Sequence, residues 1–189
     1  MPSRTARTSW IDIPLAFVIA CLALGYKHEF NVEVFDEGLT LYGSLRVANG
    51  DVPYRDFWTT YGPGSYYLVG SAFHLFGTTA GVLRKLWLLL AALVATEALI
   101  LGGRLGGRRS GWLAFAFAIA VTIVANLHAG YSAVPALAGA LGALIVSIPN
   151  RASYRAGILV GITAVFRHDF GAYAACAIAA GLFISARSH

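Results

Sequence analysis

Long apolar runs separated by short polar breaks dominate the chain. Six runs consist almost wholly of aliphatic, aromatic, alanine and glycine residues, and several have close to the length that a helix needs to cross a bilayer. Because backbone groups inside a bilayer must be hydrogen-bonded within the protein, the runs predict helices rather than strands. We predict an all-α, polytopic transmembrane helix bundle in a single domain, 1–189, with spans at 11–26, 86–103, 111–127, 131–148, 156–166 and 170–184.

The last apolar stretch is interrupted near its middle by Arg167, His168 and Asp169. Each ionisable group would cost at least ~2.5 kcal/mol at the bilayer centre, so we place all three at the membrane surface. The helix before them, 156–166, then extends only about 16 Å. A helix this short is typical of a segment that enters a cavity lined by protein.

The first polar segment, 27–85, holds six of the nine acidic residues and is too long for a simple turn. Phe35, Leu39 and Tyr42 have helical spacing, which predicts an amphipathic helix lying at the membrane surface. Asp36 stands at the start of that helix, so a helix-capping role is the simplest interpretation of its carboxylate.

A turn follows, because glycine and proline punctuate the run Tyr61, Gly62, Pro63 and Gly64. The aromatic segment 65–76 is too short to span comfortably, so we predict a second helix anchored at the membrane surface, with a short span as the alternative.

The composition supports a membrane protein. The chain is 58% hydrophobic and only 12% charged, whereas soluble domains are nearer one quarter charged. A soluble chain of 189 residues could not bury that much apolar surface, which excludes a soluble enzyme, a disordered chain and a disulfide scaffold. The two cysteines lie in apolar runs and have no metal-ligand spacing.

The net charge of +5 indicates membrane orientation rather than nucleic-acid binding. The first apolar run resembles a signal peptide, but it continues beyond Cys21 and more spans follow, so we predict a retained helix. With the N-terminus in the cytoplasm, the segment 27–85 is extracytoplasmic in a multi-pass protein of the cytoplasmic (inner) membrane. The inner side then collects eight arginines, as the positive-inside rule requires: Arg4, Arg7, Arg104, Arg108, Arg109, Arg151, Arg155 and Arg187.

Several motifs occur in a characteristic order. They are Phe35-Asp36-Glu37-Gly38, Gly50-Asp51-Val52-Pro53-Tyr54-Arg55-Asp56-Phe57, Tyr61-Gly62-Pro63-Gly64-Ser65-Tyr66-Tyr67-Leu68, and Phe166-Arg167-His168-Asp169-Phe170-Gly171. Together they resemble the N-terminal half of the GT-C membrane glycosyltransferases, which include lipid A aminoarabinose transferases and protein O-mannosyltransferases. The resemblance implies an acidic pair after the first span and two surface helices before the second. It also implies sugar transfer from a polyprenyl-phosphate donor to an extracytoplasmic glycan, lipid or protein acceptor, usually with inversion.

On this resemblance, Asp36 is the first candidate for the catalytic base that accepts the acceptor's proton, and Glu37 is the second. Asp36 could instead hold a divalent cation, Mg²⁺ or Mn²⁺, that neutralises the leaving phosphate. The resemblance gives Tyr54, Asp56, Tyr61, Gly62 and Pro63 a role in shaping the loop or contacting the acceptor.

The donor phosphate needs positive charge, and Arg84, Lys85, Arg167 and His168 are the candidates on the outer side. For Arg84 and Lys85 the alternative is snorkelling at the end of a span, and for Arg167 it is a structural pair with Asp169.

Members of this family are longer, so the chain resembles part of a larger enzyme. The missing spans would belong to the same enzyme or be supplied by a partner chain. A noncatalytic multi-pass membrane protein, either a scaffold or a small-solute carrier, is the alternative function. For Glu97, which lies inside a predicted span, we favour a packing or hydrogen-bonding role over chemistry. His74 and His128 are isolated, and we expect them to be structural.

Overall fold

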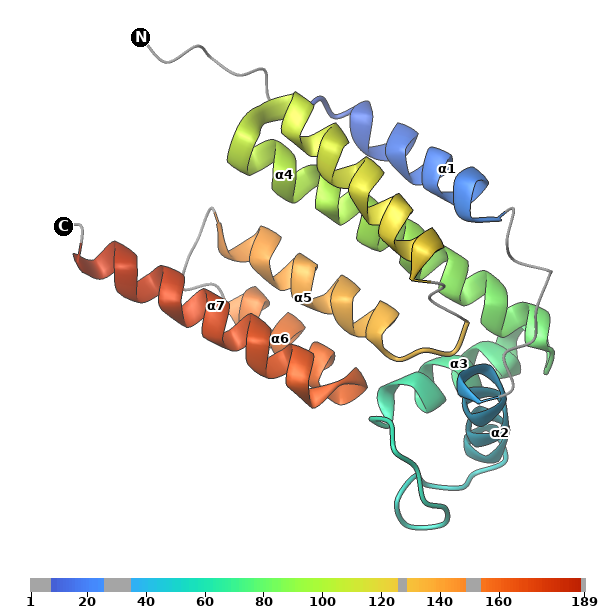
Figure 1. Ribbon diagram of the computed structural model, residues 1–189. Coiled ribbons are helices and arrows are strands. Elements are labelled where there is room, and N and C mark those ends of the chain that lie inside the picture. The colour runs from blue at the N-terminus through green and yellow to red at the C-terminus, as the bar shows by residue number, and fades with distance from the viewer. Residues whose placement is uncertain (1–7, 26–34, 126–128, 149–153, 188–189) are drawn as a thin grey trace, which may run out of the picture.

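The computed structural model describes residues 8–25, 35–125, 129–148 and 154–187. These residues form helices and no strands, which confirms the all-α class (Figure 1). Some residues used in the predictions lie outside the described residues: Arg4, Arg7, His128, Arg151, and Glu29 and Glu33, which are two of the six acidic residues of 27–85. The helices are α1 (Asp12–Gly25), α2 (Asp36–Ala48), α3 (Gly64–Phe76), α4 (Ala80–Val124), α5 (Ala133–Ser147), α6 (Tyr154–Phe166) and α7 (His168–Arg187).

Helix α4 is two antiparallel arms joined at Gly107, where φ is 83° and ψ is 179° (Figure 1). Glycine adopts this positive φ readily because it has no Cβ. The arms also approach closely, since a Cβ on Gly111 would lie 2.7 Å from the carbonyl oxygen of Leu99. The polar break predicted between 103 and 111 is therefore a tight reversal, and helices occupy both flanking ranges.

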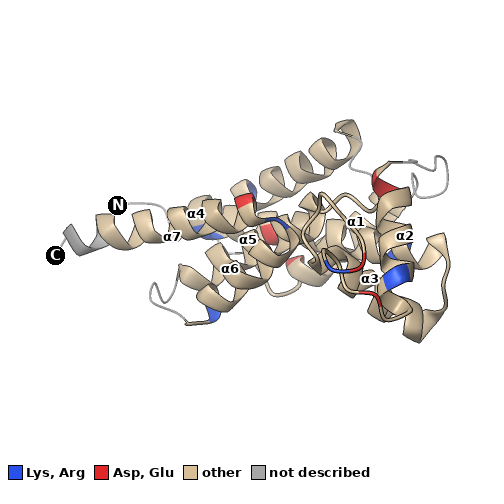
Figure 2. Cartoon of the chain, turned by 90° about the horizontal axis from the view of Figure 1, so that it is seen from below, with Lys and Arg blue, Asp and Glu red and all other residues tan. Residues whose placement is uncertain are grey.

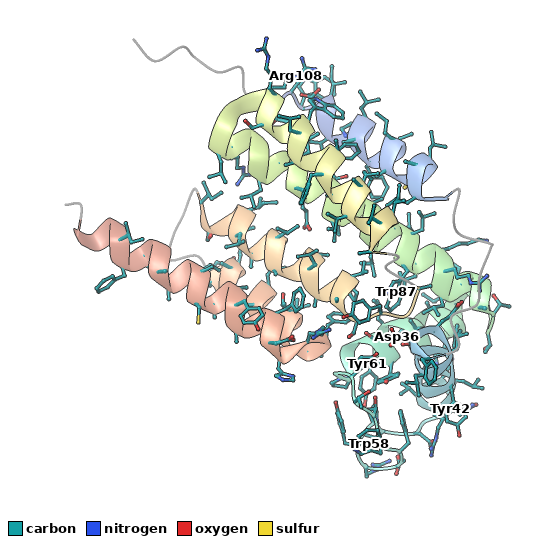
Figure 3. The ribbon with its side chains drawn as sticks, viewed as in Figure 1. Asp36, Tyr42, Trp58, Tyr61, Trp87 and Arg108 are labelled. Atoms are coloured by element: carbon teal, nitrogen blue, oxygen red, sulfur yellow. The ribbon has the colours of Figure 1, made fainter. Side chains whose placement is uncertain are left out.

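The long helices lie side by side between two ends of the bundle (Figure 1). At one end, which we call the α2–α3 end, the helix pair α2 and α3 packs near the starts of α4, α5 and α7. At the other, which we call the Gly107 end, the reversal of α4 lies near the start of α1. Figure 3 labels Arg108 at the Gly107 end and Asp36, Tyr61 and Trp87 at the α2–α3 end.

Two clusters of buried side chains hold the bundle together. Ala16 and Ala20 of α1 pack with Leu99 and Phe115 from both arms of α4. Near the α2–α3 end, Val69 and Phe73 of α3 pack with Leu83, Trp87 and Val134. The second cluster packs α3 against the first turns of α4 and α5, which fixes the end of the loop that precedes α3.

Many large apolar side chains face outward from the bundle. Within the described residues, α4, taken from Ala80 to Val124, is the one helix long and apolar enough to cross a membrane, a test that a soluble core helix can also pass. Helices α1, α5, α6 and α7 are apolar but shorter. Exposed side chains along α1, α4, α6 and α7 include Leu15, Val18, Leu22, Leu89, Leu113, Phe117, Ile158, Ile162, Phe183 and Ile184.

Candidate functional site

A buried ion pair joins the first turn of α2 to the start of α4. The Glu37 side chain is only 2% exposed, and the Arg84 guanidinium grips it with Nε–Oε1 and Nη2–Oε2 distances of 2.6 and 3.1 Å. This fork geometry gives both a strong and a directional interaction. Of the two predicted acidic residues, Glu37 therefore anchors α2 to α4, and its partner Arg84 is engaged by protein.

Asp36, the neighbouring carboxylate, is half-buried and points to a different partner (Figure 3). The Tyr61 hydroxyl donates a hydrogen bond to Asp36 Oδ1. Burial, and then the adjacent Asp36 carboxylate, raise the pKa of Tyr61 above its ordinary value of 10. Because its phenol stays protonated through neutral pH, Tyr61 remains a donor that fixes the direction of the carboxylate.

The turn that carries Tyr61 is pressed against the end of α6. A Cβ on Gly62 would collide with the backbone carbonyls of Val165 and Phe166, and one on Gly64 would lie 2.9 Å from the Phe166 ring. The Tyr54 hydroxyl also donates to the Tyr61 carbonyl oxygen at 2.6 Å. The predicted turn thus makes two kinds of contact. It directs the Tyr61 hydroxyl toward Asp36, and its glycines pack against the end of α6.

A second turn, 129–132, lies against α2 from the other side. Gly130 has a φ of 92°, and a Cβ there would lie 2.7 Å from the Asp36 carbonyl oxygen. The Thr40 hydroxyl donates to the Gly130 carbonyl at 2.9 Å, and Trp87 Nε1 donates to the Tyr131 carbonyl at 3.0 Å. These bonds fix the turn between α2, α4 and the start of α5.

Arg167 forms the junction between α6 and α7 and is partly accessible. Its Nε and Nη2 donate to the Asp169 carboxylate at 3.1 and 2.6 Å, and its Nη1 donates to the Tyr131 hydroxyl at 3.3 Å. Its Cζ also lies 5.2 Å from the centroid of the Phe170 ring. The Asp169 carboxylate raises the pKa of Arg167, so the guanidinium is a permanent cation. The Arg167–Asp169 pair that the sequence offered as an alternative is present.

The other predicted site residues lie on the surface. Lys85 and His168 are exposed. Asp56 is held in its own loop, where it accepts hydrogen bonds from Arg55 Nη2 and from the Val52 backbone N–H, each at 2.7 Å. These two interactions lower the pKa of Asp56 from 3.8 to about 2. Asp56 therefore shapes the loop that precedes Tyr61.

Two features at opposite ends of the bundle were absent from the sequence predictions. One is Tyr131, which the sequence shows only as the first residue after a polar turn. The other is Asp12, whose side chain is 2% exposed and is bound by Arg108 through two bonds of 2.8 Å. A separation of 96 residues leaves no local signal for that pairing.

Glu97 is buried within α4 and faces α5. A Cβ on Gly142 would lie 3.2 Å from its Oε1, so the absence of a side chain there makes room for the carboxyl group. Its Oε2 has no hydrogen-bond partner among the described residues. The side chain packs between helices away from the α2–α3 end.

The donor set around Asp36 does not make a dedicated metal site. Among the described residues, no three His, Cys, Asp or Glu side chains gather closely enough to hold an ion. Glu37 is directed at Arg84, which leaves one carboxylate and the Tyr61 hydroxyl. Mg²⁺ held by one carboxylate takes its remaining ligands from water and substrate phosphate, so these residues alone form no preformed metal site and we assign no chemical step to a metal.

Comparison with protein-family models, curated proteins and solved structures found no match. The resemblance to the GT-C glycosyltransferases therefore rests on the sequence motifs alone.

Proposed function

We propose that the chain is a membrane glycosyltransferase module of the GT-C type, which transfers a sugar from a polyprenyl-phosphate donor to an acceptor outside the cytoplasm. One observation carries the proposal. At a single end of an apolar helix bundle, a partly accessible carboxylate, Asp36, is oriented by Tyr61, while a permanent cation, Arg167, lies on the adjoining junction.

The surface of the bundle supports a membrane location. Soluble monomers rarely expose large contiguous apolar patches, whereas helices α1, α4, α6 and α7 expose leucine, isoleucine, valine and phenylalanine along their lengths. Figure 2 shows these helices almost entirely in the colour of uncharged residues. In the bilayer, these faces would contact lipid acyl chains and the polyprenyl tail of the donor.

The distribution of charge supports one orientation. Arg104, Arg108 and Arg109 flank the Gly107 reversal, and Arg155 lies in the first turn of α6 at the same end. The positive-inside rule assigns this end to the cytoplasm. The α2–α3 end then faces outward, which puts Asp36 and Arg167 on the side where polyprenyl-linked sugars are used by such enzymes.

The proposed reaction needs one base and one anion site. A hydroxyl or amine of the acceptor attacks the anomeric carbon, and its proton passes to the Asp36 carboxylate. The bond between the anomeric carbon and the phosphate oxygen breaks, and its electron pair leaves with polyprenyl phosphate. The charge on that phosphate is met by N–H groups of Arg167, whose planar fork matches phosphate oxygens.

Replacing the base tests the proposal. Asp36→Asn keeps the size of the side chain but removes its basicity, so we expect sugar transfer to fall by about 100-fold or more. Membranes containing the protein from its complete reading frame would be supplied with sugar-bearing undecaprenyl phosphate that is radiolabelled in its lipid, and the released undecaprenyl phosphate would be measured. Asp51→Asn, just after α2, where the carboxylate pairs with Arg46 rather than with Tyr61, is the matched control. Unchanged turnover in Asp36→Asn at equal protein level would contradict the assignment.

A noncatalytic scaffold is the second candidate, and one observation favours it. The two arginines predicted to bind phosphate already bind carboxylates, Arg84 with Glu37 and Arg167 with Asp169, as they would in a purely structural bundle. The same assay separates the two functions, because a scaffold releases no undecaprenyl phosphate from any labelled donor. A reading frame that continues into further spans would favour the larger enzyme that the motifs resemble.

A further inference from the structure

The turn 129–132 touches both halves of the proposed site. On one side Gly130 lies against the backbone of Asp36 and Glu37 and accepts a hydrogen bond from Thr40. On the other side the Tyr131 side chain reaches Arg167. The turn therefore contacts both the segment that carries the Asp36 carboxylate and the Arg167 guanidinium, and it fixes their relative positions.

We propose that Tyr131 is a positioning residue for Arg167, one that sets the direction in which the guanidinium presents its free donors to a phosphate group. The inference rests on the proposed function, since it assigns the phosphate of the polyprenyl donor to Arg167. It adds a residue that no motif in the sequence singled out.

Tyr131 contacts the guanidinium in two ways. Its hydroxyl accepts a hydrogen bond from Nη1 at 3.3 Å, and the centroid of its ring lies 5.8 Å from the Arg167 Cζ. Asp169 binds the Nε and Nη2 edge of the same group. A guanidinium has five N–H donors, and these two residues use three of them. The other two have no partner among the described residues and can bind an anion.

The position of Tyr131 is itself well determined. Its carbonyl oxygen accepts hydrogen bonds from Trp87 Nε1 at 3.0 Å and from the Val134 backbone N–H at 3.2 Å. Trp87 is a buried member of the cluster beneath α3. The backbone of Tyr131 is therefore fixed by two hydrogen bonds. A side chain that orients another side chain needs such a fixed position.

Asp169 alone would leave the guanidinium free to tilt about its two bonded atoms. The third bond, to Tyr131 from a different segment of the chain, removes that freedom. Orientation of this kind lowers the entropy lost when a phosphate binds, so it strengthens donor binding rather than proton transfer. The roles of Tyr131 and Asp36 should accordingly separate in kinetics.

Binding of undecaprenyl phosphate without sugar tests the proposal directly. The purified protein in detergent would be titrated with the radiolabelled lipid, and with inorganic phosphate in a parallel arm that distinguishes a lipid phosphate from a free one. We expect Tyr131→Phe to weaken lipid binding about tenfold, the scale of one hydrogen bond to a charged group. Tyr42→Phe, which alters an exposed tyrosine of α2, is the control and should bind as the wild type does.

Two further readouts separate positioning from a merely structural role. In the transfer assay Tyr131→Phe should raise the KM for the donor about tenfold and leave kcat within about twofold, whereas Asp36→Asn should lower kcat. Because Tyr131 acts through Arg167, adding Tyr131→Phe to Arg167→Ala should cause no further loss of binding.

The outcomes distinguish this inference from the proposed function. If the wild type binds and transfers but Tyr131→Phe binds equally well, only the inference is overturned. If Tyr131→Phe weakens lipid binding while no labelled donor is turned over, the inference stands and the glycosyltransferase function fails. A wild-type protein that binds no undecaprenyl phosphate overturns both.

Discussion

At both ends of the bundle an arginine binds a buried carboxylate, but the two ion pairs differ in their exposure to solvent. At the Gly107 end, the buried Asp12 is gripped by Arg108, and at the α2–α3 end the buried Glu37 is gripped by Arg84. The arginines differ in environment, because the Arg108 side chain is 53% exposed and that of Arg84 only 17%. The Asp12–Arg108 pair therefore lies at the surface of the bundle, and the Glu37–Arg84 pair lies largely inside it.

The surroundings of the pairs differ as well. Asp12 also accepts a hydrogen bond from the Ser9 backbone at 2.8 Å, so its pair joins the start of α1 to the reversal of α4. At the same end as Glu37 lie further polar groups that interact with one another, namely Asp36 with Tyr61 and Tyr131 with Arg167. At each end, a buried ion pair connects two helices. Only at the α2–α3 end do further accessible polar groups lie near the pair, and these form the candidate site.

The largest expected difference between the ends concerns the arginines. Arg84→Ala would leave the buried Glu37 carboxylate without its guanidinium, so the free energy of unfolding should fall by about 3–5 kcal/mol. Arg108→Ala should cost less, because water reaches that position and can hydrate Asp12. Titration with SDS, followed by tryptophan fluorescence, measures both variants. Equal losses would mean that the two pairs are energetically equivalent, against the difference in burial.

The turns provide a smaller and more specific contrast. Gly130 and Gly50 both have a positive φ, but a Cβ on Gly130 would meet the backbone of α2 whereas one on Gly50 would meet nothing within 4 Å. We expect Gly50→Ala to cost about 1 kcal/mol of unfolding free energy from backbone strain, and Gly130→Ala about 2–4 kcal/mol because steric overlap is added.

Donor turnover sharpens this contrast, since only Gly130→Ala displaces the turn from Asp36. Turnover should fall in Gly130→Ala and remain at the wild-type level in Gly50→Ala. If both variants lose turnover alike, the loss follows from strain in general and the contact between the turn and α2 has no special role.

Within α2 itself, two glycines should respond in opposite directions. A Cβ on Gly43 would lie 2.5 Å from the Tyr66 ring, so Gly43→Ala should cost about 1–3 kcal/mol. A Cβ on Gly38 would meet nothing within 4 Å, so Gly38→Ala should stabilise by about 0.5 kcal/mol through helix propensity. Melting temperatures measured in one detergent suffice, and destabilisation by Gly38→Ala would show that the first turn of α2 needs glycine.

Much of the fold follows from local pattern. Apolar runs and polar breaks placed the helices, because each run is bounded by residues that are costly to bury. The polar break between 103 and 111 marked the place of the reversal, and the spacing of Phe35, Leu39 and Tyr42 marked α2. These features depend on a few neighbouring residues, so a single sequence contains them.

The pairing of charges could not be predicted in the same way. Arg84 looked like a phosphate ligand and Glu37 like a second base, but they contact each other across 47 residues. Asp12 was hidden in an apolar run, and Tyr131 is distinguished only by what surrounds it in three dimensions. Which cation meets which carboxylate depends on helix packing, and several choices fit the same pattern of residues.

The spacing of the contacts around Asp36 also sets an order of assembly during synthesis. Tyr61 becomes available first, Arg84 and Gly130 follow as later helices emerge from the ribosome, and Arg167 comes last. A nascent chain arrested before α6 would contain Asp36, Tyr61 and Arg84 but not Arg167. In chain order, the contact between Tyr61 and Asp36 can therefore form before the contacts of Arg167, which require α6 and α7.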